Sequence, residues 1–389
     1  GTTLTDTGSV TFTDVDLTDR AVATEATKTV TAVAQNGTDV LTLTAQQQAD
    51  IEAAFSIVNV DTNTNDGTVT WDYTITEEQL DFLGEGEVVT AVFTITVTDD
   101  EGATDTQDVT VTITGSNDSP DIQVVDVTGT VLEGTTLTDT GSVTFTDVDL
   151  TDTPVATEAT STVTAVAQGG GALTLTAQQQ ADIEAAFTIS DSGNTNDGTV
   201  TWDYTLTEGQ LDFLGEGEVV TAVFTITVTD DEGATDTQDV TLTITGSNDT
   251  PEIQIVDVAG TILEGTTLTD TGSVTFTDVD LTDRAVATEA TKTVTAVAQN
   301  GTDVLTLTAQ QQADIEAAFS IVNVDTNTND GEVTWDYTIT EEQLDFLGEG
   351  EVVTAVFTMT VTDDEGATDT QDVTITITGS NDTPEIQIV

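Results

Sequence analysis

The chain has 389 residues and a formal net charge of −68, from 72 acidic and 4 basic residues, and it contains no cysteine and no histidine. So few basic residues argue against binding to nucleic acid or to anionic membranes, because both are bound through Lys and Arg. Without Cys and His, disulfides, ordinary zinc sites and catalysis by a His base are excluded. The many carboxylates repel one another in a compact fold unless cations neutralise them. This composition therefore favours the binding of a hard cation by oxygen ligands.

The sequence consists of three long repeats. The segment Gly-Thr-Thr-Leu-Thr-Asp-Thr-Gly-Ser-Val begins at Gly1, Gly134 and Gly265, and the third copy matches the first at 115 of the 118 positions up to Asp118. We expect modules over residues 1–118, 119–249 and 250–382, called here the first, second and third repeat, with residues 383–389 beginning a fourth. The first repeat starts where the second has already completed its first strand, so we expect a piece of a longer protein. No signal peptide and no run of 18 apolar residues is visible.

The second repeat is complete and shows the predicted secondary structure most clearly. Residues 178–187 are expected to be helical, and residues 173–176 to extend the strand before them or to fold back on it through the turn at Gly169. Val200, Trp202 and Tyr204 share one face of a strand and are expected in the core. Alternation of apolar and polar residues, the strand pattern, covers the ranges 122–131, 141–146, 160–167, 187–189, 200–206, 218–229 and 235–245. Such short strands predict an all-β fold of tandem immunoglobulin-like β-sandwich modules, with one short helix each, arranged end to end.

Acidic residues gather in the loops at the two ends of each predicted sandwich. If every strand reverses direction, the loops after residues 146 and 229 lie at the near pole, which faces the preceding repeat. The loops after residues 131 and 206 then lie at the far pole, with the outgoing linker. Two acidic poles meet at each junction and repel each other at low effective dielectric. Ca²⁺ binds roughly six to eight oxygens from carboxylates and carbonyls, so we expect calcium at the junctions.

The predicted calcium ligands come from three segments of each repeat, the near-pole loops, the far-pole loop after the first strand and the linker. They are Asp14, Asp16, Asp99, Asp100, Glu101, Asn117, Asp118, Glu133, Asp147, Asp149, Asp230, Asp231, Glu232, Asn248, Asp249, Glu264, Asp278, Asp280, Asp363, Asp364 and Glu365. A further segment, residues 61–67, resembles the start of an EF-hand loop, but its glycine is one place late and the closing Glu is missing. We interpret this segment as a turn first and as an additional calcium site second.

Several segments together resemble a VCBS repeat. They are Val127-Thr-Gly-Thr-Val-Leu-Glu-Gly, Phe145-Thr-Asp-Val-Asp-Leu-Thr-Asp, Gly198-Thr-Val-Thr-Trp-Asp-Tyr-Thr, Leu211-Asp-Phe-Leu-Gly-Glu-Gly-Glu, Thr225-Ile-Thr-Val-Thr-Asp-Asp and Thr243-Ile-Thr-Gly-Ser-Asn-Asp-Thr-Pro. The resemblance covers all three copies. It implies cadherin-like modules of a giant bacterial surface adhesin of the RTX type, exported by type I secretion and linked to biofilm formation. On the same resemblance, Asp147, Asp149, Asn248, Asp249 and their copies are similar to the calcium-binding pieces of cadherin linkers.

Three classes of function remain open on the sequence. The leading hypothesis is a calcium-rigidified extender that holds a ligand-binding tip away from the cell, outside the cell and without enzymatic activity. Its expected partners are calcium ions and neighbouring repeats, with no nucleic acid and no direct membrane insertion. A second possibility is a filament subunit that self-associates head to tail by strand complementation. A third is a carbohydrate- or partner-binding module that uses Trp71, Trp202 and Trp335. A glycosidase with paired carboxylates is disfavoured, because the three repeats would then carry three copies of one active site.

Overall fold

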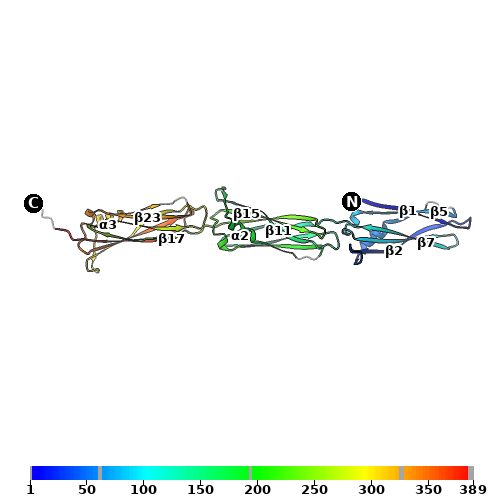
Figure 1. The fold of residues 1–389 in the computed structure, drawn as a ribbon, viewed down its shortest axis with the longest axis horizontal. Helices are drawn as coiled ribbons and strands as arrows, with labels where there is room; N and C mark the ends of the chain where they lie inside the picture. Colours follow the sequence, from blue (N-terminus) through cyan, green and yellow to red (C-terminus); the bar gives the residue numbers. More distant parts are fainter. Residues whose placement is uncertain (1, 60–63, 192–194, 324–327, 384–389) are drawn as a thin grey trace.

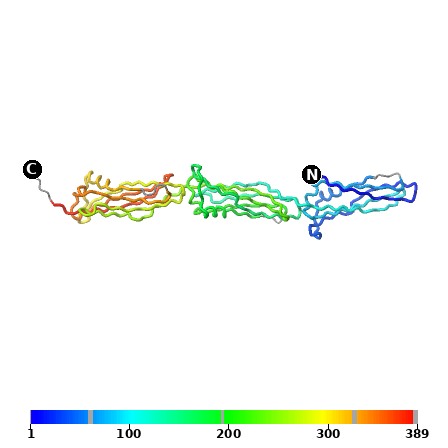
Figure 2. Tube along the Cα trace, turned by 45° about the horizontal axis from the view of Figure 1, so that its top comes forward, coloured from blue at the N-terminus to red at the C-terminus, as the bar shows by residue number. Residues whose placement is uncertain are grey.

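The three repeats form three β-sandwiches joined end to end in a rod, shown as a ribbon and as a tube (Figures 1 and 2). The computed structural model describes residues 2–59, 64–191, 195–323 and 328–383. Each sandwich encloses its own cluster of buried apolar side chains. The all-β prediction of tandem sandwiches, each containing a short helix, is therefore confirmed, and the third repeat has a second, four-residue helix as well. Much of the predicted turn at residues 61–67 lies outside the described residues.

In the second repeat, two sheets face each other. One has the order β13-β14-β10-β8 and the other β12-β11-β15-β16-β9. Their strands are β8 (Asp121–Asp126), β9 (Thr128–Leu132), β10 (Thr138–Thr146), β11 (Val155–Val166), β12 (Ala172–Leu173), β13 (Phe187–Asp191), β14 (Asp197–Thr205), β15 (Val219–Thr229) and β16 (Thr235–Thr245). Helix α2 (Ala177–Ala185) and the 3₁₀ helix η2 (Glu208–Gln210) lie in the connections. The short β12 folds back on β11, as one of the two sequence readings predicts.

The third repeat has the same two sheets, β17-β19-β23-β22 and β18-β25-β24-β20-β21. Its elements are β17 (Glu252–Ile255), β18 (Ala259–Leu263), β19 (Thr269–Thr277), β20 (Val286–Val297), β21 (Val304–Leu305), α3 (Ala309–Ala317), β22 (Phe319–Asn323), β23 (Asp330–Thr338), α4 (Glu341–Leu344), β24 (Val352–Thr362) and β25 (Thr368–Thr378).

The first repeat has one strand fewer in each sheet, with the orders β1-β5-β4 and β3-β2-β6-β7 among the described residues. Its elements are β1 (Thr3–Thr13), β2 (Val22–Val33), β3 (Val40–Leu41), α1 (Ala45–Ala53), β4 (Phe55–Asn59), β5 (Asp66–Thr76), the 3₁₀ helix η1 (Glu77–Gln79), β6 (Val88–Thr98) and β7 (Thr104–Thr114).

The single first strand predicted over residues 122–131 is wrong, because the segment divides between the two sheets. Its first half, β8, pairs antiparallel with β10, and its second half, β9, pairs parallel with β16. The core-facing Ile122 occupies an even position, whereas the core-facing Val127 and Val131 occupy odd ones. Side chains alternate strictly along a strand, so one continuous strand would direct the even and the odd positions to opposite faces. Because the chain crosses from one sheet to the other, the apolar residues of both halves can face the core.

Aromatic side chains fill the centre of each sandwich. Trp202 and Tyr204 are fully buried, and Phe187 stacks on Phe224 with ring centroids 4.2 Å apart. The Tyr204 hydroxyl donates to the carbonyl oxygen of Ile183 at 3.1 Å, which fixes helix α2 to the sheet. The prediction that Trp202 and Tyr204 belong to the core is confirmed, so Trp202 offers no surface on which a sugar could stack.

Candidate metal centres at the module junctions

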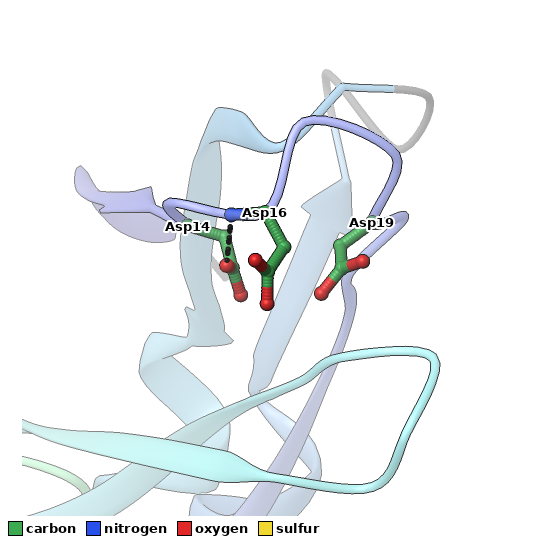
Figure 3. Close-up of side chains that lie close together, drawn as sticks. All are labelled: Asp14, Asp16 and Asp19. Carbon is green, nitrogen blue, oxygen red and sulfur yellow. Dashed lines mark hydrogen bonds between the residues drawn. The ribbon is translucent and has the colours of Figure 1, made fainter.

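The loop after β10 directs three carboxylates inward. This Asp-x-Asp loop covers residues 147–152, with copies at 14–19 and 278–283. The Asp149 N–H donates to Oδ1 of Asp147 at 3.0 Å, and this turn places both side chains on the same side of the backbone. Asp147, Asp149 and Asp152 each offer one oxygen, and these three oxygens lie within 4.8 Å of one another. Figure 3 shows the copy in the first repeat, where three carboxylates extend in the same direction from one loop.

A second acidic turn, after β15, lies beside the Asp-x-Asp loop at the near pole. Oδ1 of Asp230 accepts the backbone N–H groups of Glu232 at 3.0 Å and Ala234 at 2.7 Å, so this carboxylate holds its own turn together. In the first repeat, Asp19, Asp99 and Glu101 bring one oxygen each within 4.8 Å of the others. The two near-pole loops therefore contribute to one acidic cluster, as the strand-reversal argument predicts.

The linker from the preceding repeat completes the near pole. The Asp118 N–H donates to Oδ2 of Asp149 at 2.9 Å, and Nδ2 of Asn117 donates to Oδ2 of Asp230 at 3.0 Å. The second junction repeats both contacts, from Asp249 to Asp280 at 2.8 Å and from Asn248 to Asp363 at 3.0 Å. Asp149 and Asp280 are fully buried, whereas their copy Asp16 is exposed in the first repeat. The linker is thus part of the site.

The far pole forms its own acidic group. Glu133 follows β9, Asp212 follows η2 and Asp249 lies in the linker, and one oxygen of each lies within 4.8 Å of the others. Oε2 of Glu133 accepts the Ser247 N–H at 2.9 Å, which positions the buried carboxylate against the linker. The third repeat groups Glu264 with Asp345 and Asp382 in the same way.

A buried glutamate that the sequence analysis missed connects the two sides of each junction. Oε2 of Glu218 accepts the Gly215 N–H at 3.2 Å, and Oε1 accepts the Thr282 hydroxyl of the next repeat at 2.8 Å. Glu87 makes the same pair of contacts, the second of them with Thr151 at 2.7 Å. Glu218 is only 1% exposed. Its one sequence signal is its place in the Gly-Glu-Gly-Glu segment before a strand, and nothing local indicates a partner in the next repeat.

Burial raises the pKa of several carboxyl groups at the junctions. It raises the pKa of Asp149 and of Asp152 to about 7, and that of Asp283 to about 8. The pKa of Glu133 rises to about 7 for the same reason, even though the Ser247 N–H acts in the opposite direction. Neighbouring carboxylates raise these values further, because like charges disfavour ionisation.

Buried side-chain oxygens without a hydrogen-bond partner concentrate at the same places. Among the described residues, every buried and unpaired side-chain atom is an oxygen at the end of a repeat: Asn117 Oδ1, Glu133 Oε1, Asp147 Oδ2, Asp149 Oδ1, Asp152 Oδ2, Asn248 Oδ1, Glu264 Oε1, Asp278 Oδ2, Asp280 Oδ1 and Asp283 Oδ2. Within the same residues, the ion pairs are Lys28–Asp108 and Lys292–Asp372, which join strands away from the junctions. No basic side chain of the described chain thus pairs with a junction carboxylate.

The structure distributes the predicted ligands unequally. Those that are buried lie at the junctions, except Glu264, which lies at the far pole of the third repeat. The linker residues at the junctions are Asn117, Asp118, Asn248 and Asp249. Asp100, Asp231 and Asp364 are exposed, as are Glu101, Glu232 and Glu365, and Asp231 accepts the Thr153 hydroxyl. The predicted set omits Asp19, Asp152, Asp212, Asp283, Asp345 and Asp382, which lie within the acidic groups. The third Asp of each Asp-x-Asp loop follows the second by three residues in the sequence, so it could have been predicted as a ligand.

No family model matches the chain, and no curated protein matches it. The resemblance to VCBS repeats therefore stays a prediction. Among solved structures, the chain is similar to protocadherin gamma B2 extracellular cadherin domains 1–5, with 14% identity and a TM-score of 0.38, over 85% of this chain and 53% of that one. It is also similar to zebrafish RET cadherin-like domains 1 to 4, with 15% identity and a TM-score of 0.24, over 83% of this chain and 65% of that one. The chain thus spans roughly half to two thirds of these proteins.

Among the described residues, no helix is both long and apolar enough to cross a membrane.

Proposed function

We propose that the chain is a calcium-stiffened extender, a stalk segment of a bacterial surface adhesin that holds a binding tip away from the cell. One observation carries this proposal: the buried oxygens without partners lie at the ends of the repeats. The modules are already rigid, so the stiffness of a stalk depends on the junctions between them. The junctions are where a cation would supply it.

The chemistry of the donor set fits calcium. A buried ionised carboxylate without a partner is costly, and coordination of a metal is one of the few arrangements that compensates for it. Carboxylate and amide oxygens are ligands of hard cations such as Ca²⁺. At the second junction, Asp278, Asp280, Asp283, Asp363 and Asn248 would hold the ion nearest the third repeat. Glu133, Asp212 and Asp249 would hold the ion nearest the second repeat.

The arrangement of the modules supports a spacer. The rod places three sandwiches in line (Figure 1), and the third repeat differs from the first at three of the 118 compared positions. Near-identical copies add length without adding a new binding specificity. The modules would cover residues 1–118, 119–249 and 250–382, and residues 383–389 would begin a further one. The resemblance to VCBS repeats supports an extracellular location, reached by type I secretion.

Small-angle X-ray scattering tests the proposal directly. The chain is measured in millimolar calcium, in magnesium and in excess chelator. We expect a straight rod in calcium, and bending, shortening or unfolding of the rod after chelation. Magnesium should not replace calcium fully, because it demands a smaller and more regular ligand shell. A scattering profile that is the same in calcium and in chelator would contradict the proposal.

A matched pair of variants ties the result to the junctions. Asp149→Asn with Asp280→Asn removes one charge from each junction. Asp72→Asn with Asp203→Asn removes the same charge from exposed positions in strands β5 and β14. We expect the junction variant to need about tenfold more calcium to straighten, equivalent to about 1.4 kcal/mol. The strand variant should respond like the unchanged chain.

A further inference from the structure

The position after the third aspartate of each Asp-x-Asp loop differs between neighbouring repeats. It is Arg20 in the first repeat, Thr153 in the second and Arg284 in the third. The chain has four basic residues in all, and the other two are the lysines that pair with strand aspartates away from the junctions. Half of the basic residues of a very acidic chain therefore lie in the loops that carry the proposed calcium ligands.

The guanidinium of Arg284 contacts the backbone of its own loop. Its Nη1 group donates to the carbonyl oxygen of Asp283 and lies 3.5 Å from the carbonyl oxygen of Leu281. Arg20 makes the first of these contacts in the first repeat, to Asp19 at 2.6 Å, so the contact is a property of the loop itself. Arg284 is half-buried. A positive charge is thus held in the loop, and within the described residues it forms no ion pair with a carboxylate.

Thr153 makes a different contact at the same position. Its hydroxyl donates to the Asp231 carboxylate, at 2.9 Å from Oδ1 and 3.1 Å from Oδ2, and so joins the Asp-x-Asp loop to the acidic turn after β15. The hydroxyl carries no charge, so the second repeat keeps the full negative charge of its loop. The two internal junctions therefore differ by one positive charge at this position.

The oxygens available to a cation are the same in both loops. Oδ2 of Asp278, Oδ1 of Asp280 and Oδ2 of Asp283 are buried without a hydrogen-bond partner, and the second repeat leaves the same three oxygens of its own loop unpaired. The linker also makes the same contacts with the near pole at both junctions. The near-pole sites thus share their donors, and the residue after the third aspartate changes their charge.

A positive charge in the same short loop acts on calcium binding in two ways. It repels a bound Ca²⁺, because like charges interact across several ångströms even at high effective dielectric. Without calcium, it offsets part of the mutual repulsion of the carboxylates, so it stabilises the calcium-free loop. Both effects reduce the free energy that is gained when calcium binds.

We propose that the residue after the third aspartate sets the calcium affinity of each near-pole site. Arg284 lowers the affinity of the site at the second junction, and the neutral Thr153 leaves the affinity of the site at the first junction undiminished. Two sites with the same near-pole donors thus respond to different calcium concentrations. This inference rests on the calcium role proposed above and adds a residue that regulates it.

Titrations of calcium against an indicator dye test the proposal on the full chain, in an Asp149→Asn background that weakens the first junction. Arg284→Gln removes the charge and keeps a hydrogen-bond donor, so we expect it to bind calcium about fivefold more tightly. Arg284→Lys keeps the charge and should bind like the unchanged residue. The gain should shrink at high salt, because screening weakens the effect of a charge. Lys292→Gln removes the same charge from β20 and should leave the affinity unchanged.

The reverse change tests the first junction, in an Asp280→Asn background that weakens the second. Thr153→Arg should weaken calcium binding about fivefold. Thr153→Gln also loses the hydroxyl that bonds to Asp231, but it adds no charge, so it should change the affinity much less.

Thermal melts in chelator give a second readout with the opposite sign. Without calcium, Arg284→Gln should lower the melting temperature by a few degrees, because the loop loses its positive charge, and Arg284→Lys should not. A residue that only packs would change stability in the same direction with and without calcium. Equal calcium affinity of Arg284→Gln, Arg284→Lys and the unchanged chain would overturn the inference and leave the calcium proposal intact. Absence of calcium binding by the unchanged chain would overturn both.

Discussion

The backbone N–H of Leu281 donates a hydrogen bond to the carbonyl oxygen of Phe213 at 3.2 Å, across the junction between the second and third repeats. The Leu281 side chain packs against the core of the second repeat. Leu150 and Phe82 make the same hydrogen bond at the first junction, also at 3.2 Å. Phe82 and Phe213 are each 7% exposed. At the second junction an apolar contact therefore lies beside the acidic groups, and at both junctions the backbone hydrogen bond does not depend on a cation.

This contact predicts how the junctions loosen. Leu150→Ala with Leu281→Ala removes the apolar side chains and leaves the backbone hydrogen bonds and the carboxylates. We expect a broader distribution of rod lengths by small-angle scattering even in calcium, because the carboxylates alone do not hold one fixed angle. Each repeat should keep its stability within about 1 kcal/mol, since these leucines lie outside the sandwich centres.

Leu17→Ala is the matched control for that prediction. Leu17 is exposed and contacts no preceding repeat in the described structure, so its truncation should leave the length distribution unchanged. If the two-leucine variant scatters like the unchanged chain, the apolar contact does not contribute to stiffness.

A second prediction concerns Glu218. Truncation in Glu218→Ala leaves the Gly215 N–H and the Thr282 hydroxyl without their acceptor at a buried place. A buried donor left unpaired costs about 1–3 kcal/mol. We expect the transition of the second and third repeats in a thermal melt to move down by several degrees, and the calcium requirement for a straight rod to rise.

Glu351→Ala is the internal control for Glu218. Glu351 accepts the Gly348 N–H at 3.0 Å, but it is more exposed and makes no hydrogen bond to a following repeat in the described chain. Its truncation should therefore cost less than that of Glu218. Equal losses at both positions would mean that the contact across the junction adds nothing.

The sequence predicts the parts of this fold that depend on local pattern. The strands follow from alternation, and the burial of Trp202 follows from its place on the apolar face of β14. The near-pole cluster was predictable because two acidic loops lie at one end of a sandwich. The contact of Glu218 with Thr282 was not, because it joins residues 64 positions apart through the angle between two modules. That angle is a tertiary property, and no periodicity of the sequence encodes it.

The third prediction is a pH dependence that calcium reverses. In the calcium-free chain, burial raises the pKa of Asp280 to about 7 and that of Asp283 to about 8, well above the ordinary value of an Asp carboxyl, about 4. Between these values the folded chain binds more protons than the unfolded chain, so the free energy of unfolding falls as pH rises. Below about pH 4 both states are protonated and the dependence disappears.

Thermal melts in chelator should therefore show a lower melting temperature at about pH 8 than at about pH 5, by roughly 5 °C or more. In saturating calcium the slope should reverse, because metal ligands must be deprotonated. Asp149→Asn with Asp280→Asn should flatten the slope in chelator. Parallel pH profiles with and without calcium would count against both the pKa shifts and the calcium proposal.

The last prediction uses a glycine that faces the buried tryptophan of each repeat. A Cβ atom on Gly141 would lie 2.4 Å from Cζ2 of Trp202, closer than any real contact, and on Gly8 it would lie 2.5 Å from the same atom of Trp71. Gly141→Ala should destabilise the second repeat by about 1–3 kcal/mol, because Trp202 is fully enclosed and cannot move away. Gly8→Ala should cost less, since Trp71 is only half-buried and borders a cavity of about 810 Å³ into which it can shift. Thermal melts of both variants measure the difference, with Gly169→Ala as the control because no atom lies within 4 Å of its added Cβ.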